Sequence, residues 1–351
     1  MNTIRSGYIF IVTLILLAGL SFLVTHIALQ TDTFVHYART VIDQYKAREL
    51  AMAGVHIGMS QLADGIVTDK EQERETITTD QQLAKRLLRQ MVSRNGTWQT
   101  YALKRNADGI NGTIQICIAC EEGKVDLNAW YDKQTDTFIG EGQKQGDYKK
   151  IAQQLFARIT SLTKSSDLFA AYSEFMQKRP IILNDVTELL TVKSFDVFAD
   201  TIFFEPHEPS EGGHQTQYPL YLDDLFTVWS HARIFEPWLL SDSMCAVLGL
   251  KRTLNKGKEN IVPQELPDTF VWEKDWDTFL APLYGKKYTE VPEFIRPLLA
   301  TKFEPKTFSV LSYGKIGKVT QKVLAIVELK VSTTQKKQKR YDASIRTIYW
   351  L

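Results

Sequence analysis

The chain has 351 residues, and its 42 lysines and arginines nearly balance its 41 aspartates and glutamates, giving a formal net charge of +1. With 44% hydrophobic and 24% charged residues, the composition is that of a folded protein of about two domains. It excludes wholesale disorder, a collagen-like repeat and a disulfide-rich miniprotein. The near-zero charge balance also argues against a protein that mainly grips nucleic acid by its phosphates, so we expect no nucleic-acid partner.

The apolar residues are concentrated near the N-terminus. No Asp, Glu, Lys or Arg occurs from Tyr8 to Leu29, and about 20 helical residues are enough to cross the hydrocarbon core of a bilayer. Three interpretations are open: a cleaved secretory signal, a plain membrane anchor, and a prepilin-type helix. The leader of residues 1–7 is short, carries Arg5 and ends in Gly7 directly before the apolar run. This is the pattern cut by prepilin peptidases, and we favour it.

Cleavage is then expected between Gly7 and Tyr8, leaving an N-methylated Tyr8 at the start of a helix that the mature chain keeps. Arg5 and the terminal amine favour the cytoplasmic side by the positive-inside rule. We therefore expect a single-pass protein of the inner (cytoplasmic) membrane, with a cytoplasmic N-terminus and its bulk in the periplasm or otherwise outside the cell. The lipid bilayer is its first expected partner.

The helix is predicted to continue beyond the membrane. No proline occurs from Thr31 to Ala63, and apolar residues recur there at helical spacing. Asp64-Gly65 provides a stop, because glycine adopts the left-handed conformation that ends helices. We predict one helix over Tyr8–Ala63, with a plain anchor followed by a separate helix as the alternative. Small residues that would let it pack closely on other membrane helices are Ala18, Gly19 and Ser21.

The remaining chain is predicted to form an α+β head with a mostly helical domain inserted in it. Residues 64–130 form the first part: a solvated connector, a helix over Asp80–Ser93, and an antiparallel meander of strands at Thr97–Leu103, Thr113–Ala119 and Val125–Leu127. Residues 131–250 form the insert, with helices over Gln145–Leu162, Leu168–Lys178, Asn184–Leu190 and Asp223–Trp229. Residues 251–351 complete the head with proline-rich loops and a second antiparallel meander, Thr307–Tyr313, Val319–Val331 and Tyr341–Trp350, turning at Gly314–Gly317.

Four segments, in this order, resemble one family: Glu122–Ala129, Asn184–Val192, Leu225–Val228 and Phe308–Gly317. The family is the K-type minor pseudopilin of type II secretion, general secretion pathway protein K. Its members lack the glutamate that other pilins carry at the fifth mature position, and this chain has Val12 there. The chain departs from the family pattern by lacking two acidic segments of the insert.

The resemblance implies a non-enzymatic subunit of a type II secretion or type IV pilus-like machine that helps to start and cap the pseudopilus tip for protein export. The implied partners are other minor pseudopilins, the inner-membrane assembly platform and the prepilin peptidase. The alternative is a signal-anchored extracytoplasmic binding or hydrolytic protein unrelated to pili. The sequence contains no Gly-x-Ser-x-Gly, phosphate-binding loop or His-Glu-x-x-His to favour an enzyme.

Cys117 and Cys120 form a CxxC pair at the end of an isoleucine-rich predicted strand. Redox CxxC motifs usually begin a helix, and no second pair is present to complete a four-thiolate zinc site. We therefore expect buried thiols or a structural disulfide rather than redox catalysis.

Metal ligands are scarce. His207 and His214 share a loop with several glutamates, and the favoured interpretation is a polar surface loop rather than a divalent-metal site. Asp223-Asp224 stands where a helix cap would be expected. By family analogy these aspartates could hold calcium, but the missing acidic segments argue against it, so we expect no cofactor, with calcium as the alternative.

The even charge balance hides a polarised C-terminus. Residues 315–351 hold nine basic and two acidic residues. Two explanations are open. Lysines on hairpin edges discourage unwanted strand pairing, and a basic surface could also contact an acidic neighbouring subunit.

Overall fold

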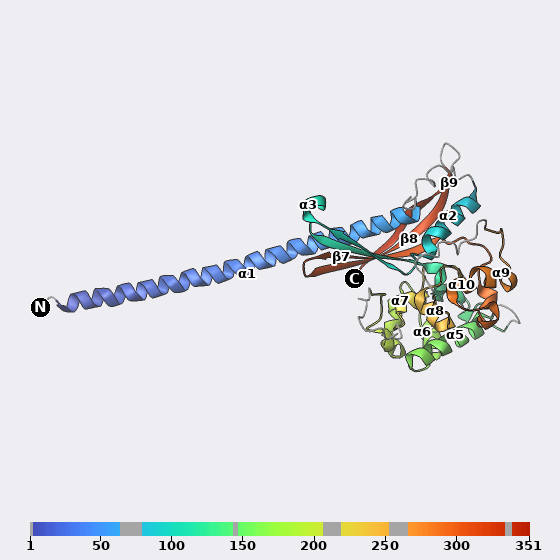
Figure 1. Ribbon diagram of the computed structural model, residues 1–351. Coiled ribbons are helices and arrows are strands. Elements are labelled where there is room, and N and C mark those ends of the chain that lie inside the picture. The colour runs from blue at the N-terminus through green and yellow to red at the C-terminus, as the bar shows by residue number, and fades with distance from the viewer. Residues whose placement is uncertain (1–2, 64–78, 143–146, 206–218, 253–265, 334–338) are drawn as a thin grey trace.

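The computed structural model describes residues 3–63, 79–142, 147–205, 219–252, 266–333 and 339–351. It consists of a long N-terminal helix, a five-stranded sheet at the far end of that helix, and a lobe of short helices beside the sheet (Figure 1). The predicted α+β class is confirmed. The predicted boundaries after residues 7, 63, 130 and 250 stay predictions, and the connector at 64–78 lies outside the described residues.

Helix α1 runs without interruption over Thr3–Ala63. Its 61 residues correspond to about 90 Å. The prediction of one continuous helix is therefore confirmed, and the helix begins five residues before Tyr8. Figure 1 shows its first part standing clear of the rest of the protein and its last part lying along the sheet.

The sheet joins two strand groups that lie far apart in the sequence. Its order is β1-β2-β7-β8-β9, and every neighbouring pair is antiparallel. The strands are β1 (Trp98–Leu103), β2 (Gly112–Cys120), β7 (Thr307–Ile316), β8 (Val319–Thr333) and β9 (Lys339–Trp350). Pairing of β2 with β7 places Ile118 opposite Val310. The C-terminal meander is confirmed, although its first turn falls at Gly317 because β7 runs on through Gly314 to Ile316.

One strand was predicted in the wrong sheet. Val125–Leu127 does not extend the first meander. Instead Val125–Asp126 forms the short strand β3, which pairs in parallel with β6 (Phe226–Thr227) in a separate two-stranded sheet. The Glu121–Gly123 3₁₀ turn redirects the chain after β2, so that β3 leaves the main sheet and enters the lobe.

The last part of α1 covers one face of the sheet at very short range. Its glycines remove the side chains that would hold helix and strand apart. A Cβ atom at Gly54 would lie 2.0 Å from Ser312 Oγ, and one at Gly58 would lie 2.7 Å from Val310. Ala47, Leu50, Ile114, Ile116 and Ile316 form a buried apolar cluster at this contact. Helix α2 (Asp80–Val92), predicted over Asp80–Ser93, adds further apolar side chains to the core.

The lobe consists of short elements around an aromatic core. Its helices are α4 (Leu127–Trp130), α5 (Tyr148–Thr163), α6 (Leu168–Lys178), α7 (Leu222–Leu225), α8 (Asp242–Leu248), α9 (Trp272–Phe279) and α10 (Ala281–Tyr284), with 3₁₀ turns at Val186–Thr191, Lys193–Phe198, Tyr288–Glu290 and Arg296–Leu298 and a hairpin of β4 (Tyr131–Asp132) and β5 (Thr137–Phe138). The predicted helices at 145–162 and 168–178 correspond to α5 and α6. The segment predicted as a helix over 184–190 forms the 3₁₀ turn Val186–Thr191 instead, and Asp185 caps this turn.

The helix predicted over Asp223–Trp229 is wrong. Only one turn forms, α7, and its N-cap position is Tyr221 rather than Asp223. Phe226 and Thr227 then become a buried strand, because the parallel partner β3 satisfies their backbone groups. Phe226 stacks on Phe156 of α5, with ring centroids 5.3 Å apart, which holds the strand inside the lobe.

Candidate membrane and assembly helix

The first part of α1 is apolar and exposed. Its most apolar stretch of 18 residues has a mean hydropathy of 2.4, and no residue of that stretch is buried. Phe22 is 76% exposed and Phe34 is 70% exposed. Among the described side chains of α1, the first buried one is Ala47. An aqueous protein rarely exposes so large an apolar surface, so this segment requires a covering, and its length and composition suit a membrane span.

The threonine hydroxyl groups from Thr13 to Thr40 donate hydrogen bonds to backbone carbonyls of the helix itself. Thr25 Oγ1 donates to the Ser21 carbonyl at 2.8 Å, and Thr31 Oγ1 donates to the Ile27 carbonyl at 2.8 Å. Within a bilayer no water is present to accept a hydrogen bond from these hydroxyl groups. The bonds to the helix backbone therefore remove the free-energy penalty of an unsatisfied hydroxyl group in lipid. The threonines are therefore compatible with a lipid environment.

The residues predicted to pack against partner helices all lie on this exposed part. Ala18, Gly19 and Ser21 are exposed, and a Cβ atom at Gly19 would meet nothing within 4 Å. Val12 is exposed on the same helix. The head leaves all four residues accessible to another helix. Gly7 and Tyr8 lie within the first turns of α1.

Apolar exposure continues past the predicted span. Along the following turns of α1 the exposed large side chains are Phe34, Val35, Tyr37, Val41, Ile42 and Tyr45. At the start of this stretch His26 and Gln30 form a side-chain hydrogen bond of 3.0 Å, which marks the change from an apolar to a mixed surface. A helix that reaches about 25 Å beyond a membrane with apolar side chains still uncovered is suited to packing with similar helices.

The junction between sheet and lobe was not predicted from the sequence. Asn95, which precedes β1, donates from Nδ2 to the Leu239 carbonyl at 3.0 Å and accepts from the Cys120 amide at 2.8 Å. Arg252 Nη1 donates to the Asn95 carbonyl at 2.5 Å, and its Nη2 donates to the Leu240 carbonyl at 2.8 Å. These bonds connect the lobe to the sheet.

A buried ion pair lies at the same junction. Lys124 Nζ is 2.6 Å from Glu121 Oε1, and Thr227 Oγ1 donates to the other carboxylate oxygen of Glu121. Burial alone would lower the pKa of Lys124, but the carboxylates of Asp223, Glu121 and Asp224 outweigh it and raise that pKa. Lys124 therefore stays charged and serves as a structural cation rather than a proton donor.

The two cysteines of the CxxC pair lie on opposite faces of β2. Cys117 packs with Leu311 and Tyr313, whereas Cys120 belongs to the main core and donates its thiol proton to Glu122 Oε2 at 3.3 Å. Both thiols are buried and unpaired, and burial raises the pKa of each well above its usual value. A disulfide between them would require β2 to be rebuilt.

No group of three or more His, Cys, Asp or Glu side chains that could hold a metal occurs among the described residues. The histidine loop with His207 and His214 lies outside them. Asp224 is occupied structurally: its Oδ2 accepts from the Ser243 amide at 2.7 Å, and its carbonyl accepts from Ser241 Oγ. For Asp223, burial raises the pKa to about 7. Asp224 thus connects α7 to the start of α8.

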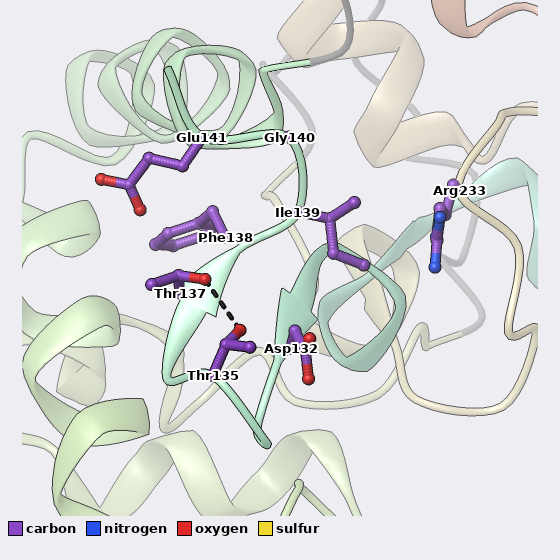
Figure 2. A pocket seen from close by; sticks show the side chains of 8 residues that line it. All are labelled: Asp132, Thr135, Thr137, Phe138, Ile139, Gly140, Glu141 and Arg233. Atoms are coloured by element: carbon purple, nitrogen blue, oxygen red, sulfur yellow. Dashed lines mark hydrogen bonds between the residues drawn. The ribbon is translucent and has the colours of Figure 1, made fainter. Parts of the chain in front are cut away.

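An open hollow of about 480 Å³ lies beside the β4–β5 hairpin. Figure 2 shows that the hairpin and the segment after it supply most of its lining, with Arg233 reaching in from another part of the chain. Its polar groups are largely engaged: the Thr135 and Thr137 hydroxyls are 2.9 Å apart, and Glu141 pairs with Lys149 at 2.6 Å. The charged groups of its lining are Asp132, Glu141 and Arg233.

No family model matches the chain, and no curated protein matches it significantly in sequence. Among solved structures, the chain is similar to one chain of the crystal structure of the GspK-GspI-GspJ complex from the type 2 secretion system of enterotoxigenic Escherichia coli. The TM-score is 0.41 and the identity 11%, over 92% of this chain and 99% of that chain.

Proposed function

We propose that the chain is a non-enzymatic minor pseudopilin of a type II secretion or type IV pilus-like machine. Helix α1 carries the proposal: one uninterrupted helix has an exposed apolar beginning and an end that packs on a sheet through Gly54 and Gly58. A protein that only needed an anchor would have no use for a rigid helix that continues from the span into the head. The kinked, separate anchor expected of a signal-anchored binding or hydrolytic protein is not what α1 forms.

The proposed location is the inner membrane. The segment from Tyr8 to Leu29 would cross the bilayer, with Arg5 on the cytoplasmic side and the head outside. Helices of other minor pseudopilins would pack on Ala18, Gly19 and Ser21 in lipid and on the exposed apolar side chains beyond it. The assembly platform and the prepilin peptidase would be the membrane partners.

The proposed place of the subunit is the tip. With Val12 instead of glutamate, the helix offers no carboxylate to the terminal amine of a subunit placed above it. That amine would be left without a partner in an apolar bundle, which is costly. A subunit of this kind fits best where nothing is stacked above it, so it would start assembly and cap the pseudopilus.

The N-terminus of the mature protein tests the proposal. In membranes that contain a prepilin peptidase, mass spectrometry should find a chain that begins with N-methylated Tyr8. The Gly7→Val variant should keep Met1, whereas Gly19→Val, which changes a glycine further along the same helix, should still be cut. Wild-type protein that starts at Met1, or beyond Ala28, would show that α1 is not a prepilin helix.

A further inference from the structure

Two turns of the sheet point back along α1 toward its N-terminus. They are the β1–β2 turn, which contains α3 (Arg105–Asp108), and the β7–β8 turn at Gly317 (Figure 1). The contacts with α1 give the direction: Val310 of β7 meets Gly58, whereas Gly314 meets Ala47, so β7 runs toward the beginning of the helix. If α1 crosses a membrane, these turns form the membrane-facing rim of the head.

The two turns lie side by side. In the sheet, Ala102 is opposite Thr113, and Thr113 is opposite Lys315. Two exposed basic residues lie in or directly beside each turn: Lys104 and Arg105 at one, Lys315 and Lys318 at the other. We call these four residues the basic rim.

The charges of the basic rim are uncompensated within the described part of the protein. None of the four side chains makes an ion pair with another described residue, and Asp108, the acidic residue of the β1–β2 turn, accepts a bond from the Lys104 amide instead. Four basic residues further from the rim on β8 and β9 make ion pairs: Lys322 with Glu205, Lys330 with Glu328, Lys339 with Asp80 and Arg340 with Asp342. Arg346 of β9 instead donates to the Trp229 carbonyl. Basic side chains that only protect a sheet edge could be paired in the same way, whereas the four side chains of the basic rim are left free for an acidic partner.

The distance from the rim to the membrane is short enough for electrostatic attraction. From Leu29 to Ala47 the helix rises about 27 Å, and the three residues from Gly314 to Gly317 return about 10 Å toward the membrane. Headgroups extend about 6 Å beyond the hydrocarbon core, and a lysine side chain reaches a further ~6 Å. The remaining gap is about 5 Å, which is inside a Debye length of about 8 Å at physiological salt.

We propose that the basic rim binds the anionic headgroups of the membrane that α1 crosses, and so sets the tilt of the head over the bilayer. This inference rests on the proposed function, because it requires α1 to span a membrane. Anionic lipid is favoured over an acidic neighbouring subunit because both turns point along α1 toward the membrane. The positive charge of the basic rim is then complementary to the negative charge of the headgroups that lie nearest to it.

Spin labelling of the full chain in nanodiscs tests this directly. Thr320 is exposed and lies opposite Lys315 on β8, and the three native cysteines are buried, so Thr320→Cys takes a nitroxide selectively. Lipids with nickel-chelating headgroups report how close the label is. We expect nickel-induced relaxation to be roughly twofold larger in discs with phosphatidylglycerol than in phosphatidylcholine alone, and to lose that difference in about 1 M salt.

The variants separate the rim from a general charge effect. Lys315→Glu with Lys318→Glu should abolish the lipid dependence, as should Lys104→Glu with Arg105→Glu. The matched control, Lys274→Glu with Lys302→Glu, makes the same change in net charge at exposed positions away from the rim and should retain it. Equal relaxation in both lipids for wild-type protein would overturn the inference. A chain that fails to enter nanodiscs at all would instead overturn the spanning helix, and with it the proposed function.

Discussion

Gly314 on β7 lies directly against the backbone of Ala47 on α1. A Cβ atom at Gly314 would stand 2.1 Å from the Ala47 carbonyl oxygen and 2.4 Å from the Ala51 amide nitrogen. Both neighbours are main-chain atoms of a helix, so neither can rotate away as a side chain would. The contact fixes where the exposed part of α1 ends and the head begins.

Gly314→Ala should therefore loosen the head. The added methyl group forces α1 away from the sheet and opens gaps among the apolar side chains at Leu50 and Ile316. Overpacking of this kind costs about 1–3 kcal/mol. Denaturant unfolding of the full chain in detergent, followed by tryptophan fluorescence, should show a lower midpoint with little change in slope.

Gly19→Ala is the matched control on the same helix. Nothing lies within 4 Å of the position of its added methyl group, so the stability of the head should stay within about 0.5 kcal/mol of wild type. If Gly314→Ala unfolded at the same denaturant concentration as Gly19→Ala, the close approach of helix and strand would have no energetic role.

The bond between Asn95 and the lobe gives a second prediction. Asn95→Ala removes the donor to the Leu239 carbonyl and the acceptor for the Cys120 amide, and both partners are buried. We expect a loss of about 2–3 kcal/mol, because two buried groups are left without hydrogen bonds. Hydrogen exchange should speed up at the Cys120 amide first.

Asn111→Ala serves as the comparison for Asn95→Ala. Asn111 Oδ1 accepts from the Arg105 amide at 2.8 Å in an exposed turn, where water can replace it. Its loss should cost well under 1 kcal/mol. An equal cost for the two variants would show that Asn95 does not hold the lobe to the sheet.

The elements with local signals were predictable, and the contacts between distant segments were not. The absence of proline and the apolar spacing sufficed to predict α1. Strand-like segments separated by turn residues sufficed to predict β7, β8 and β9. Nothing local shows that Ile118 pairs with Val310, or that Gly54 and Gly58 are glycines because a strand lies against them. The wrong prediction at Phe226-Thr227 has the same origin. A short apolar run fits either a helix or a buried strand, and here pairing with the distant strand β3 makes it a strand.

One part of the candidate site could also be predicted from the sequence, and another part could not. The exposed apolar part of α1 was evident from composition, whereas the basic rim depends on two turns that only the β2–β7 pairing brings together. The sequence alone showed an excess of basic residues in 315–351. It could not show that Lys322 and Lys339 are neutralised by Glu205 and Asp80 while Lys315 and Lys318 are not.

The cysteines give a third prediction. Because Cys117 and Cys120 face opposite sides of β2, an oxidant should leave the native protein without a disulfide between them. Burial raises the pKa of both thiols, so native protein should also react slowly with iodoacetamide. Intact-mass measurement should show fewer than one added group per chain in native protein and three after denaturation. A loss of two mass units on oxidation of the native chain would contradict the placement of the two residues.

Glu122 gives a prediction about pH. Burial raises the pKa of its carboxyl group to about 7, against the hydrogen bonds from the Lys306 and Thr307 amides that lower it. In the unfolded chain the pKa is near 4.3. The folded state thus binds the proton more tightly, so the contribution of Glu122 is most favourable below pH 4 and is lost as pH rises through about 7.

Glu122→Gln keeps an oxygen that can accept from both backbone amides, but it has no charge to bury. The variant should therefore gain unfolding free energy relative to wild type as pH rises, by about 2.5 kcal/mol between pH 5 and pH 8. Denaturant titrations of both proteins at several pH values would measure this difference. Parallel pH profiles for Glu122→Gln and wild type would mean that the Glu122 carboxyl ionises as freely in the folded protein as in the unfolded chain.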